Sequence, residues 1–172
     1  MKSICAVEGV SATGLKEGKY GLALIRASGT AAGVFTSNAM RAAPVGVMME
    51  RIEQGMLDAV VVNSGCANAY TGERGYRDAV EMCEIAGGAL GLAPESVGVA
   101  STGVIGRYLN LPLITDQCTR AAPLLARSPE AEDAAAKAIM TTDTFPKHAL
   151  VETESFSVGG ITKGSGMIAP NM

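Results

Sequence analysis

The chain has 172 residues, of which 48% are hydrophobic, 4% aromatic and 18% charged, and it contains no tryptophan. This length is sufficient for one domain with a substantial core, which must be built mainly from aliphatic side chains. The formal net charge of −3 argues against nucleic-acid binding, and no run of like charge indicates a polybasic membrane patch. Because neither a transmembrane segment nor a signal peptide is visible, we expect a cytoplasmic protein that binds neither nucleic acid nor membrane.

In chain order, the first half predicts two strands, a helix, a strand and a second helix. Residues 19–27 and 31–38 have strand-like composition and are separated by Ser-Gly-Thr, which is typical of a turn. A helix is expected over 44–54, because a proline opens the segment and a glycine follows its end. The β-branched segment 57–65 predicts a strand that runs into a glycine-containing loop. The apolar stripe of 73–90 indicates a long helix.

The second half predicts a strand at 96–102, helices at 111–127 and 129–140, and a final strand at 148–158. No repeat, linker or low-complexity segment interrupts the chain. We therefore predict one domain, residues 1–172, of the α/β or α+β class. Because the final strand leads directly into a glycine loop, we expect it to lie in a sheet whose other strands come from outside this chain.

The cysteine and histidine content argues against a metal site. The four cysteines show no CxxC spacing, and His148 is the only histidine. We predict reduced cysteines that pack as small apolar residues, at Cys5, Cys66, Cys83 and Cys118. A Ser–His–Asp triad is not expected either, because His148 has no obvious nucleophile as its partner.

Two polar loops that contain glycine could carry chemistry. In the loop 101–107, the hydroxyl of Thr102 and the N–H of Gly103 could present two donors to one point, which is the geometry that an oxyanion needs. An ordinary turn is the alternative, and the sequence alone favours it. In the loop 63–72, small residues let the backbone approach a ligand closely, but Thr71 could equally cap the helix that follows.

Two further segments carry residues that could bind an anion. In the loop 140–147, Thr144 and Lys147 could hold a carboxylate, or the polar residues around them could only satisfy the end of the preceding helix. Lys163 lies among glycines and could meet an anionic ligand or lower the pKa of a nearby amine. Its surroundings lack the GK[ST] order of a phosphate-binding Walker A loop.

Taken together, the chain contains in this order the segments ATGLKEGKYGLALI, GVFTSNAMRAAPV, VVVNSGCANAYTG, STGVIGR, IMTTDTFPK and GGITKGSGMIAPNM. This series resembles the ornithine acetyltransferase family, also described as bifunctional glutamate N-acetyltransferase. The resemblance covers nearly the whole chain. Its motifs are specific, because KGSGMIAPNM after TTDTFPK is hard to obtain by chance.

The resemblance implies a layered α/β fold that is shared between two chains. Family members are made as one precursor that cleaves itself before a threonine, and this threonine begins the second, β chain. The sequence resembles the α chain, with the cleavage region at Asn171 and Met172 and without the alanine that usually follows. An α2β2 heterotetramer is the implied assembly.

The implied activity is transfer of acetyl from N2-acetylornithine to glutamate in arginine biosynthesis, by ping-pong kinetics through an acetyl-threonine intermediate. No cofactor or metal is implied, although some members accept acetyl-coenzyme A as donor. By motif, Thr102 and Gly103 correspond to the oxyanion hole, and Thr144 and Lys163 to substrate-binding positions. Two alternatives remain open: a self-cleaving amidohydrolase or aminopeptidase with an N-terminal nucleophile, and a non-catalytic binding subunit.

Overall fold

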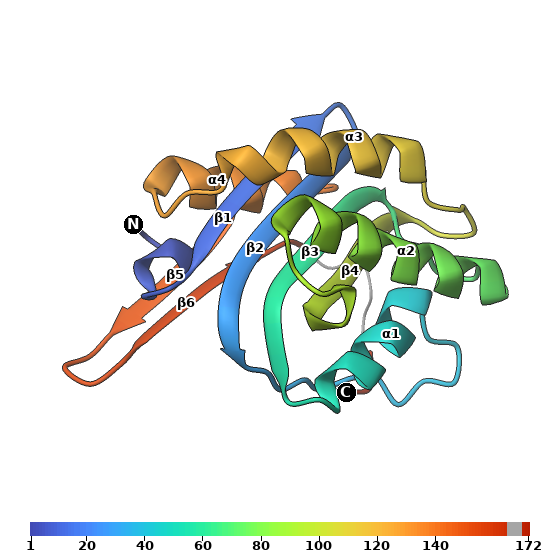
Figure 1. Cartoon of the computed structure of the whole chain (residues 1–172), viewed down its shortest axis with the longest axis horizontal. Coiled ribbons are helices and arrows are strands. Elements are labelled where there is room, and N and C mark those ends of the chain that lie inside the picture. The colour runs from blue at the N-terminus through green and yellow to red at the C-terminus, as the bar shows by residue number, and fades with distance from the viewer. Residues whose placement is uncertain (165–169) are drawn as a thin grey trace.

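The computed structural model describes residues 1–164 and 170–172. A four-stranded sheet with the order β1-β2-β3-β4 forms the centre of the molecule, as Figure 1 shows. The first three strands pair antiparallel, whereas β3 and β4 pair parallel. The strands are β1 (Ser11–Glu17), β2 (Tyr20–Thr30), β3 (Met56–Cys66) and β4 (Val97–Val104).

A separate antiparallel hairpin and several helices surround this sheet. The hairpin consists of β5 (Lys147–Glu152) and β6 (Ser157–Thr162). The α-helices are α1 (Ala43–Ile52), α2 (Gly72–Leu90), α3 (Leu111–Ala121) and α4 (Pro129–Ala138). Three short 3-10 turns complete the described elements, at η1 (Ile4–Ala6), η2 (Pro94–Ser96) and η3 (Ala122–Leu124). The predicted mixed α/β class is confirmed.

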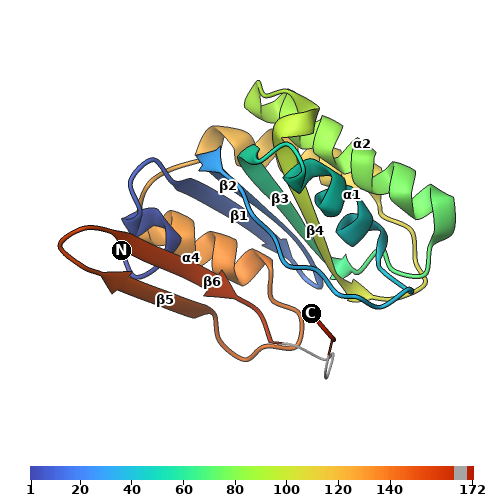
Figure 2. The same ribbon diagram turned by 90° about the horizontal axis from the view of Figure 1, so that it is seen from below.

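The helices cover the two faces of the main sheet unequally. On one face, α1, α2 and α3 enclose an aliphatic core with alternating residues of the strands, such as Ala59 and Val61 of β3. The other face packs against α4, η1 and β6 through a smaller core that includes Ala23, Ala135 and Cys5. Figure 2 shows α4 and the hairpin together on this second side. The sheet therefore lies between two apolar layers built from small and aliphatic residues, as the composition predicts.

Small residues let α4 approach the backbone of the sheet closely. A side chain at Gly14 of β1 would collide with the Ala134 carbonyl oxygen and lie 2.8 Å from Ala135 Cα. Ser128 caps this helix, because its hydroxyl accepts a hydrogen bond from the Ala131 N–H at 3.2 Å. The start of α4 is therefore as predicted, whereas its end lies at Ala138, two residues before the predicted end at 140.

Glu132 of α4 anchors the N-terminal segment. Its buried carboxylate accepts hydrogen bonds from the backbone N–H groups of Lys2 at 2.5 Å, Ser3 at 3.1 Å and Cys5 at 3.2 Å. The Ser3 hydroxyl donates a further bond at 2.9 Å. Burial raises the pKa of Glu132, but these hydrogen bonds outweigh burial and hold the pKa below its usual value.

His148 has partners that the sequence did not reveal. Its Nδ1 lies 2.9 Å from the Ser3 hydroxyl, and its Nε2 lies 3.3 Å from an oxygen of Asp133. The expectation that the histidine has no nucleophile beside it is therefore wrong. Ser3 is fully buried and donates its hydroxyl hydrogen to Glu132, so this cluster has no access for a substrate. Its role is to tie the β5–β6 hairpin to the N-terminus and α4.

The first predicted hairpin is wrong in position. The strand expected at 31–38 is irregular, and β2 forms its hairpin with the preceding strand β1. The turn between them lies at Gly18, whose φ of 59° favours glycine. The Ser-Gly-Thr segment at 28–30 does not turn, because β2 continues through an irregularity between Arg26 and Gly29 and stays paired with β3.

The final predicted strand is a hairpin. The segment 148–158 divides at Thr153, whose N–H and hydroxyl both donate to the Phe156 carbonyl, at 2.9 and 3.0 Å.

The four cysteines are free and buried, as predicted. Burial raises the pKa of Cys83 to about 11 and that of Cys118 to about 12, so both thiols stay protonated at neutral pH.

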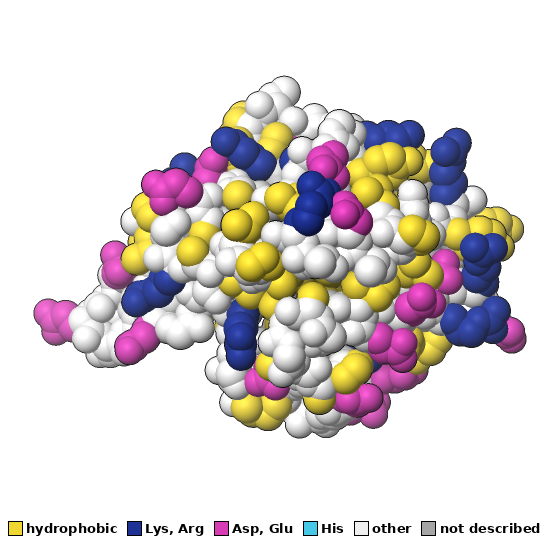
Figure 3. Space-filling model, turned by 45° about the horizontal axis from the view of Figure 1, so that its top comes forward, with side chains coloured by type: hydrophobic (Ala, Val, Ile, Leu, Met, Phe, Trp, Pro, Cys, Tyr) yellow, Lys and Arg dark blue, Asp and Glu magenta, His cyan; other side chains and the backbone are white. Residues whose placement is uncertain are grey.

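Charged side chains are dispersed over the surface. Figure 3 shows acidic and basic side chains interspersed on one face, without an extended field of one sign. This distribution agrees with the small net charge. Among the described residues, no helix is both long enough and apolar enough to cross a bilayer.

We expect Glu132→Gln to weaken the attachment of the N-terminal segment to α4. The glutamine NH2 group would replace one carboxylate oxygen that accepts hydrogen bonds, and it would face several N–H and O–H donors. The amides of residues 2–5 should lose protection about tenfold or more in hydrogen exchange followed by mass spectrometry. In the wild type the same protection should persist above the ordinary glutamate pKa of about 4.3 and be lost as pH falls through the lower folded value. Glu130→Gln on the exposed first turn is the matched control, and equal protection in the two variants would contradict the anchor.

Candidate active site

Four residues form a row across the whole main sheet. Register pairs Lys16 of β1 with Gly21 of β2, Gly21 with Ser64 of β3, and Ser64 with Thr102 of β4. Residues directly opposite in paired strands share a face of the sheet. This is the face covered by α4, because the Ser64 hydroxyl donates to the Ala138 carbonyl at 2.7 Å. The row ends at the carboxyl ends of the parallel strands β3 and β4, a common place for ligand binding in α/β sheets.

Gly103 follows Thr102 and occupies a position that only glycine fits. Its φ is 134°, a conformation that other residues rarely adopt. A side chain would collide with the backbone of Gly65 and lie 2.6 Å from the Cys66 nitrogen. Thr102 is half-buried and Gly103 is exposed, so both can be reached from outside the core. The two candidate oxyanion donors therefore lie where the end of β4 meets the end of β3.

Asp143 joins two segments that the sequence singled out separately. Its side chain, only 1% exposed, forms an ion pair with Lys147 at 2.5 Å and accepts a hydrogen bond from the Gly164 N–H. The hydrogen bond from Lys147 lowers the pKa of Asp143 to about 2, with help from the Gly164 and Thr141 amides. Asp143 is thus ionised at all ordinary pH values. It carried no assigned role in the sequence, yet it holds the loop 140–147 against the segment that follows β6.

The structure thereby brings the segments of Thr144 and Lys163 together. Thr144 is exposed one residue after Asp143, and Lys163 is half-buried one residue before Gly164. The Lys163 ammonium contacts the carbonyl oxygen of its neighbour Gly164. Lys147, the other lysine that could bind a substrate carboxylate, already forms an ion pair with Asp143. Of the two predicted lysines, Lys163 is therefore the one without a carboxylate partner among the described residues.

The C-terminal residues lie against the loop that precedes α1. The Ser37 N–H and hydroxyl both donate to the Asn171 carbonyl at 2.9 Å, and the Thr36 hydroxyl donates to the Pro170 carbonyl. Asn171 has a φ of 57° and its side chain donates to the Ser37 hydroxyl at 2.5 Å. Figure 2 shows the two segments side by side, and Met172 is exposed. The rest of the predicted glycine loop, 165–169, lies outside the described residues.

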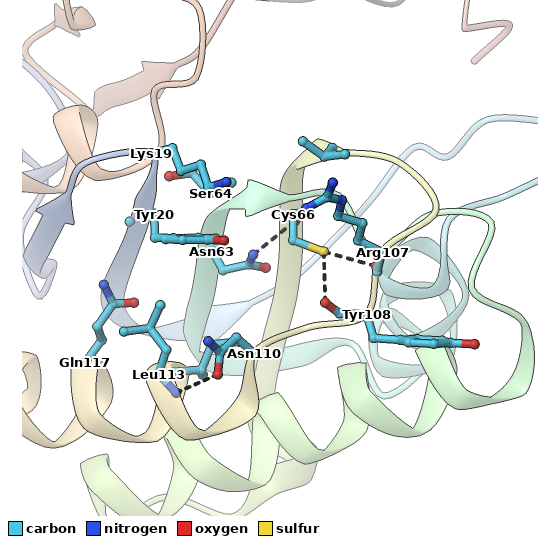
Figure 4. Close-up of a pocket in the computed structure, with 14 residues that line it drawn as sticks. Lys19, Tyr20, Asn63, Ser64, Cys66, Arg107, Tyr108, Asn110, Leu113 and Gln117 are labelled. Atoms are coloured by element: carbon cyan, nitrogen blue, oxygen red, sulfur yellow. Dashed lines mark hydrogen bonds between the residues drawn. The ribbon is translucent and has the colours of Figure 1, made fainter.

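A small pocket of about 60 Å3 lies on the opposite face of the sheet, between the ends of β3 and β4 and helix α3 (Figure 4). It has room for only a few water molecules. The Cys66 thiol donates to the Arg107 carbonyl at 3.1 Å, and the Asn63 amide donates to the Cys66 carbonyl at 3.0 Å. These bonds hold the loop after β4 in place.

The loop 63–72 is mainly structural in its side-chain contacts. Asn68 has a φ of 47° and donates to the Gly75 carbonyl at 2.7 Å. The Thr71 hydroxyl donates to the Asn68 side chain at 2.8 Å and does not cap α2, so the predicted capping role of Thr71 is wrong.

In the ranges 1–164 and 170–172, no group of three His, Cys, Asp or Glu side chains could hold a metal ion.

Fold and site define a layered α/β protein in which Thr102 and Gly103 lie at the carboxyl ends of two parallel strands, and Asp143 holds the Lys163 segment to the loop 140–147. The chain belongs to the ArgJ family, whose profile matches residues 7–172. The family resemblance seen in the motifs is thus confirmed.

Among curated relatives, glutamate N-acetyltransferase of Methanosarcina mazei is 54% identical over 98% of this chain and 43% of its own length. The arginine biosynthesis bifunctional protein ArgJ of Archaeoglobus fulgidus is 50% identical over 98% of this chain and 44% of its own. The chain thus spans less than half the length of these relatives.

Among solved structures, ornithine acetyltransferase complexed with ornithine, from Mycobacterium tuberculosis, is 35% identical with a TM-score of 0.93. The match covers 99% of this chain and 95% of that one. The Bacillus halodurans bifunctional protein argJ is 37% identical with a TM-score of 0.89, over 98% of this chain and 93% of that one.

We expect Gly103→Ala to lower the free energy of unfolding by about 2–4 kcal/mol, because the new methyl group meets the β3 backbone in a strained conformation. Gly106→Ala is the matched control: its φ of 75° is also unfavourable, but open space surrounds it. Its cost should be only about 1 kcal/mol. Urea unfolding monitored by circular dichroism compares the two, and equal losses would show that close strand contact does not matter.

Proposed function

We propose that this chain is the α part of an acetyltransferase that moves acetyl from N2-acetylornithine to glutamate in arginine biosynthesis. The observation that carries the proposal is the convergence of distant motifs on one site. Lys16 bonds to both Ser64 and Met140, and Asp143 bonds to Gly164, so the strand ends, the loop 140–147 and the Lys163 segment are linked. The names of the glutamate N-acetyltransferase and ornithine acetyltransferase relatives support the same reaction.

In this proposal Thr102 and Gly103 form the oxyanion hole. Acyl transfer passes through a tetrahedral intermediate whose oxygen becomes negative, and donors held in place before the reaction stabilise it without reorganisation. The position of Gly103, which tolerates no side chain, and the pairing of β4 with β3 support such a fixed arrangement. The same donors would serve the self-cleavage of a precursor.

The nucleophile is proposed to be a threonine that begins a separate β chain. The lengths of the relatives support this division, because the chain covers 93–95% of the two solved chains but only 43–44% of the two curated relatives. The reference pKa of an α-amine is about 7.7–8.0, so a small downward shift would let it act as base for its own hydroxyl. Acetyl would pass to this hydroxyl and then to glutamate, in an α2β2 assembly without a cofactor.

Thr144 and Lys163 are proposed to bind the substrates. Acetylornithine and glutamate share an α-carboxylate, and the ammonium of Lys163 is suited to it, whereas Lys147 is already neutralised by Asp143. Asn171 and Met172 are assigned to the cleavage region, which the bonds from Thr36 and Ser37 would hold in a fixed path. The four free cysteines support a reducing compartment such as the cytoplasm.

Thr102→Ala should lower kcat for acetyl transfer about 10²-fold, because one oxyanion donor is lost. The fold should persist, since the side chain lies only half-buried at a strand end. Thr102→Ser keeps the hydroxyl and should retain most of the rate. Steady-state kinetics of the complete enzyme measures both, and unchanged turnover of Thr102→Ala would remove the oxyanion assignment.

The reaction itself is tested by incubating the complete enzyme with acetylornithine, first without glutamate. We expect two polypeptides in intact mass spectrometry, of which the one beginning with threonine gains a single acetyl group. Glutamate should then discharge this group as N-acetylglutamate. Rapid release of acetate without glutamate would instead identify a hydrolase, and the absence of any acetylated chain would indicate a non-catalytic subunit.

A further inference from the structure

Lys16 stands out because its ammonium joins three elements at the candidate site. It donates to the Ser64 hydroxyl of β3 at 2.8 Å and to the Met140 carbonyl, which follows α4, at 2.5 Å. An ammonium has three hydrogens to donate, so one remains after these two bonds. Lys16 as a residue is exposed, but desolvation at its ammonium lowers its pKa.

The path of Lys16 across the sheet depends on Gly21. A side chain at Gly21 would collide with the Ala138 carbonyl and would lie 2.7 Å from the Ser64 oxygen and 2.9 Å from Lys16 Cδ. Because residue 21 is glycine, there is space for the Lys16 side chain to cross β2. The lysine follows the row that ends at Thr102, and with strands about 4.8 Å apart its charge lies about 8 Å from the Thr102 side chain.

The charge of Lys16 is not neutralised within the described residues. No carboxylate there forms an ion pair with it. The neighbouring Glu17 is bound instead to Arg120 at 2.8 Å and to Gln117 at 3.1 Å, on helix α3 across the sheet. Asp143, three residues after the Met140 that Lys16 contacts, is paired with Lys147. A cation without a counter-ion favours negative charge in its vicinity.

We propose that Lys16 is a positioning residue for the oxyanion hole: it orients Ser64 beside Thr102 and supplies the positive field in which the oxyanion forms. This inference rests on the proposed acetyl transfer. It assigns Lys16 no contact with substrate, and no proton leaves its ammonium during the reaction. The role is to favour the transition state over the ground state, because negative charge near Thr102 appears only there.

The test compares Lys16→Gln with Lys16→Arg in the complete enzyme. Gln removes the charge and keeps a hydrogen-bond donor, whereas Arg keeps the charge. Rates are expressed per β chain that acetylornithine can acetylate, so incompletely matured preparations remain comparable. We expect Lys16→Gln to lower kcat about tenfold, the size expected for one charge about 8 Å away in a partly solvated site, with KM for both substrates nearly unchanged.

Lys16→Arg should recover most of the rate. Lys19→Gln is the matched control, because it removes a second exposed lysine, in the turn after β1, whose ammonium lies 5.1 Å from the Tyr20 ring centre. It should leave kcat unchanged.

Several outcomes would overturn the proposal. Full rate in Lys16→Gln would show that the charge is not needed. A raised KM with unchanged kcat would make Lys16 a substrate contact. If Lys16→Gln does not fold, Lys16→Met offers an unbranched, uncharged side chain one atom shorter than lysine, and failure of both neutral variants would make the role structural only. A wild-type enzyme that transfers no acetyl would refute the proposed function, and this is visible before any Lys16 variant is measured.

Discussion

The hydroxyl of Ser64 is the junction on which the candidate site depends. It donates to the Ala138 carbonyl at the end of α4 and accepts from Lys16 of β1, so three elements are fixed at one point. This junction exists only because Gly21, which lies beneath it, has no side chain. From there Lys16 reaches the backbone of Met140, and Asp143 continues the connection to Gly164. Together these contacts link the strand ends to the loops.

The two faces of the sheet have different tasks. On the face of α1, α2 and α3, polar side chains such as Asn63, Cys66 and Asn68 bind nearby backbone and fix the loops. The opposite face carries the row of Lys16, Gly21, Ser64 and Thr102, which ends at the proposed oxyanion site. Rigid strands hold the proposed oxyanion donors, which favours preorganisation. In the proposed enzyme this chain supplies the environment of the reaction, and the attacking oxygen comes from a second chain.

Local patterns were sufficient to predict much of the fold. The apolar stripe of α2, the β-branched run of β3 and the serine cap of α4 each indicated the correct element, because each signal lies within one segment. The aliphatic core and the buried free cysteines followed from composition. The first hairpin was misplaced, because Ser-Gly-Thr at 28–30 has turn composition, but pairing with β3 keeps it extended. Tertiary contact overrode the local preference.

The sequence by itself therefore determined the periodic elements, the kind of core, the family resemblance and the motifs of Thr102, Gly103, Thr144 and Lys163. Only the tertiary structure decided how these motifs are joined. Lys16 reaches Ser64 across 48 residues of sequence and Met140 across 124, and Asp143 reaches Gly164 across 21. Such contacts are determined by the register of the strands and by the packing of α4 against glycine residues of the sheet. The sequence around these residues does not predict these contacts, because each contact depends on where a distant segment of the chain lies.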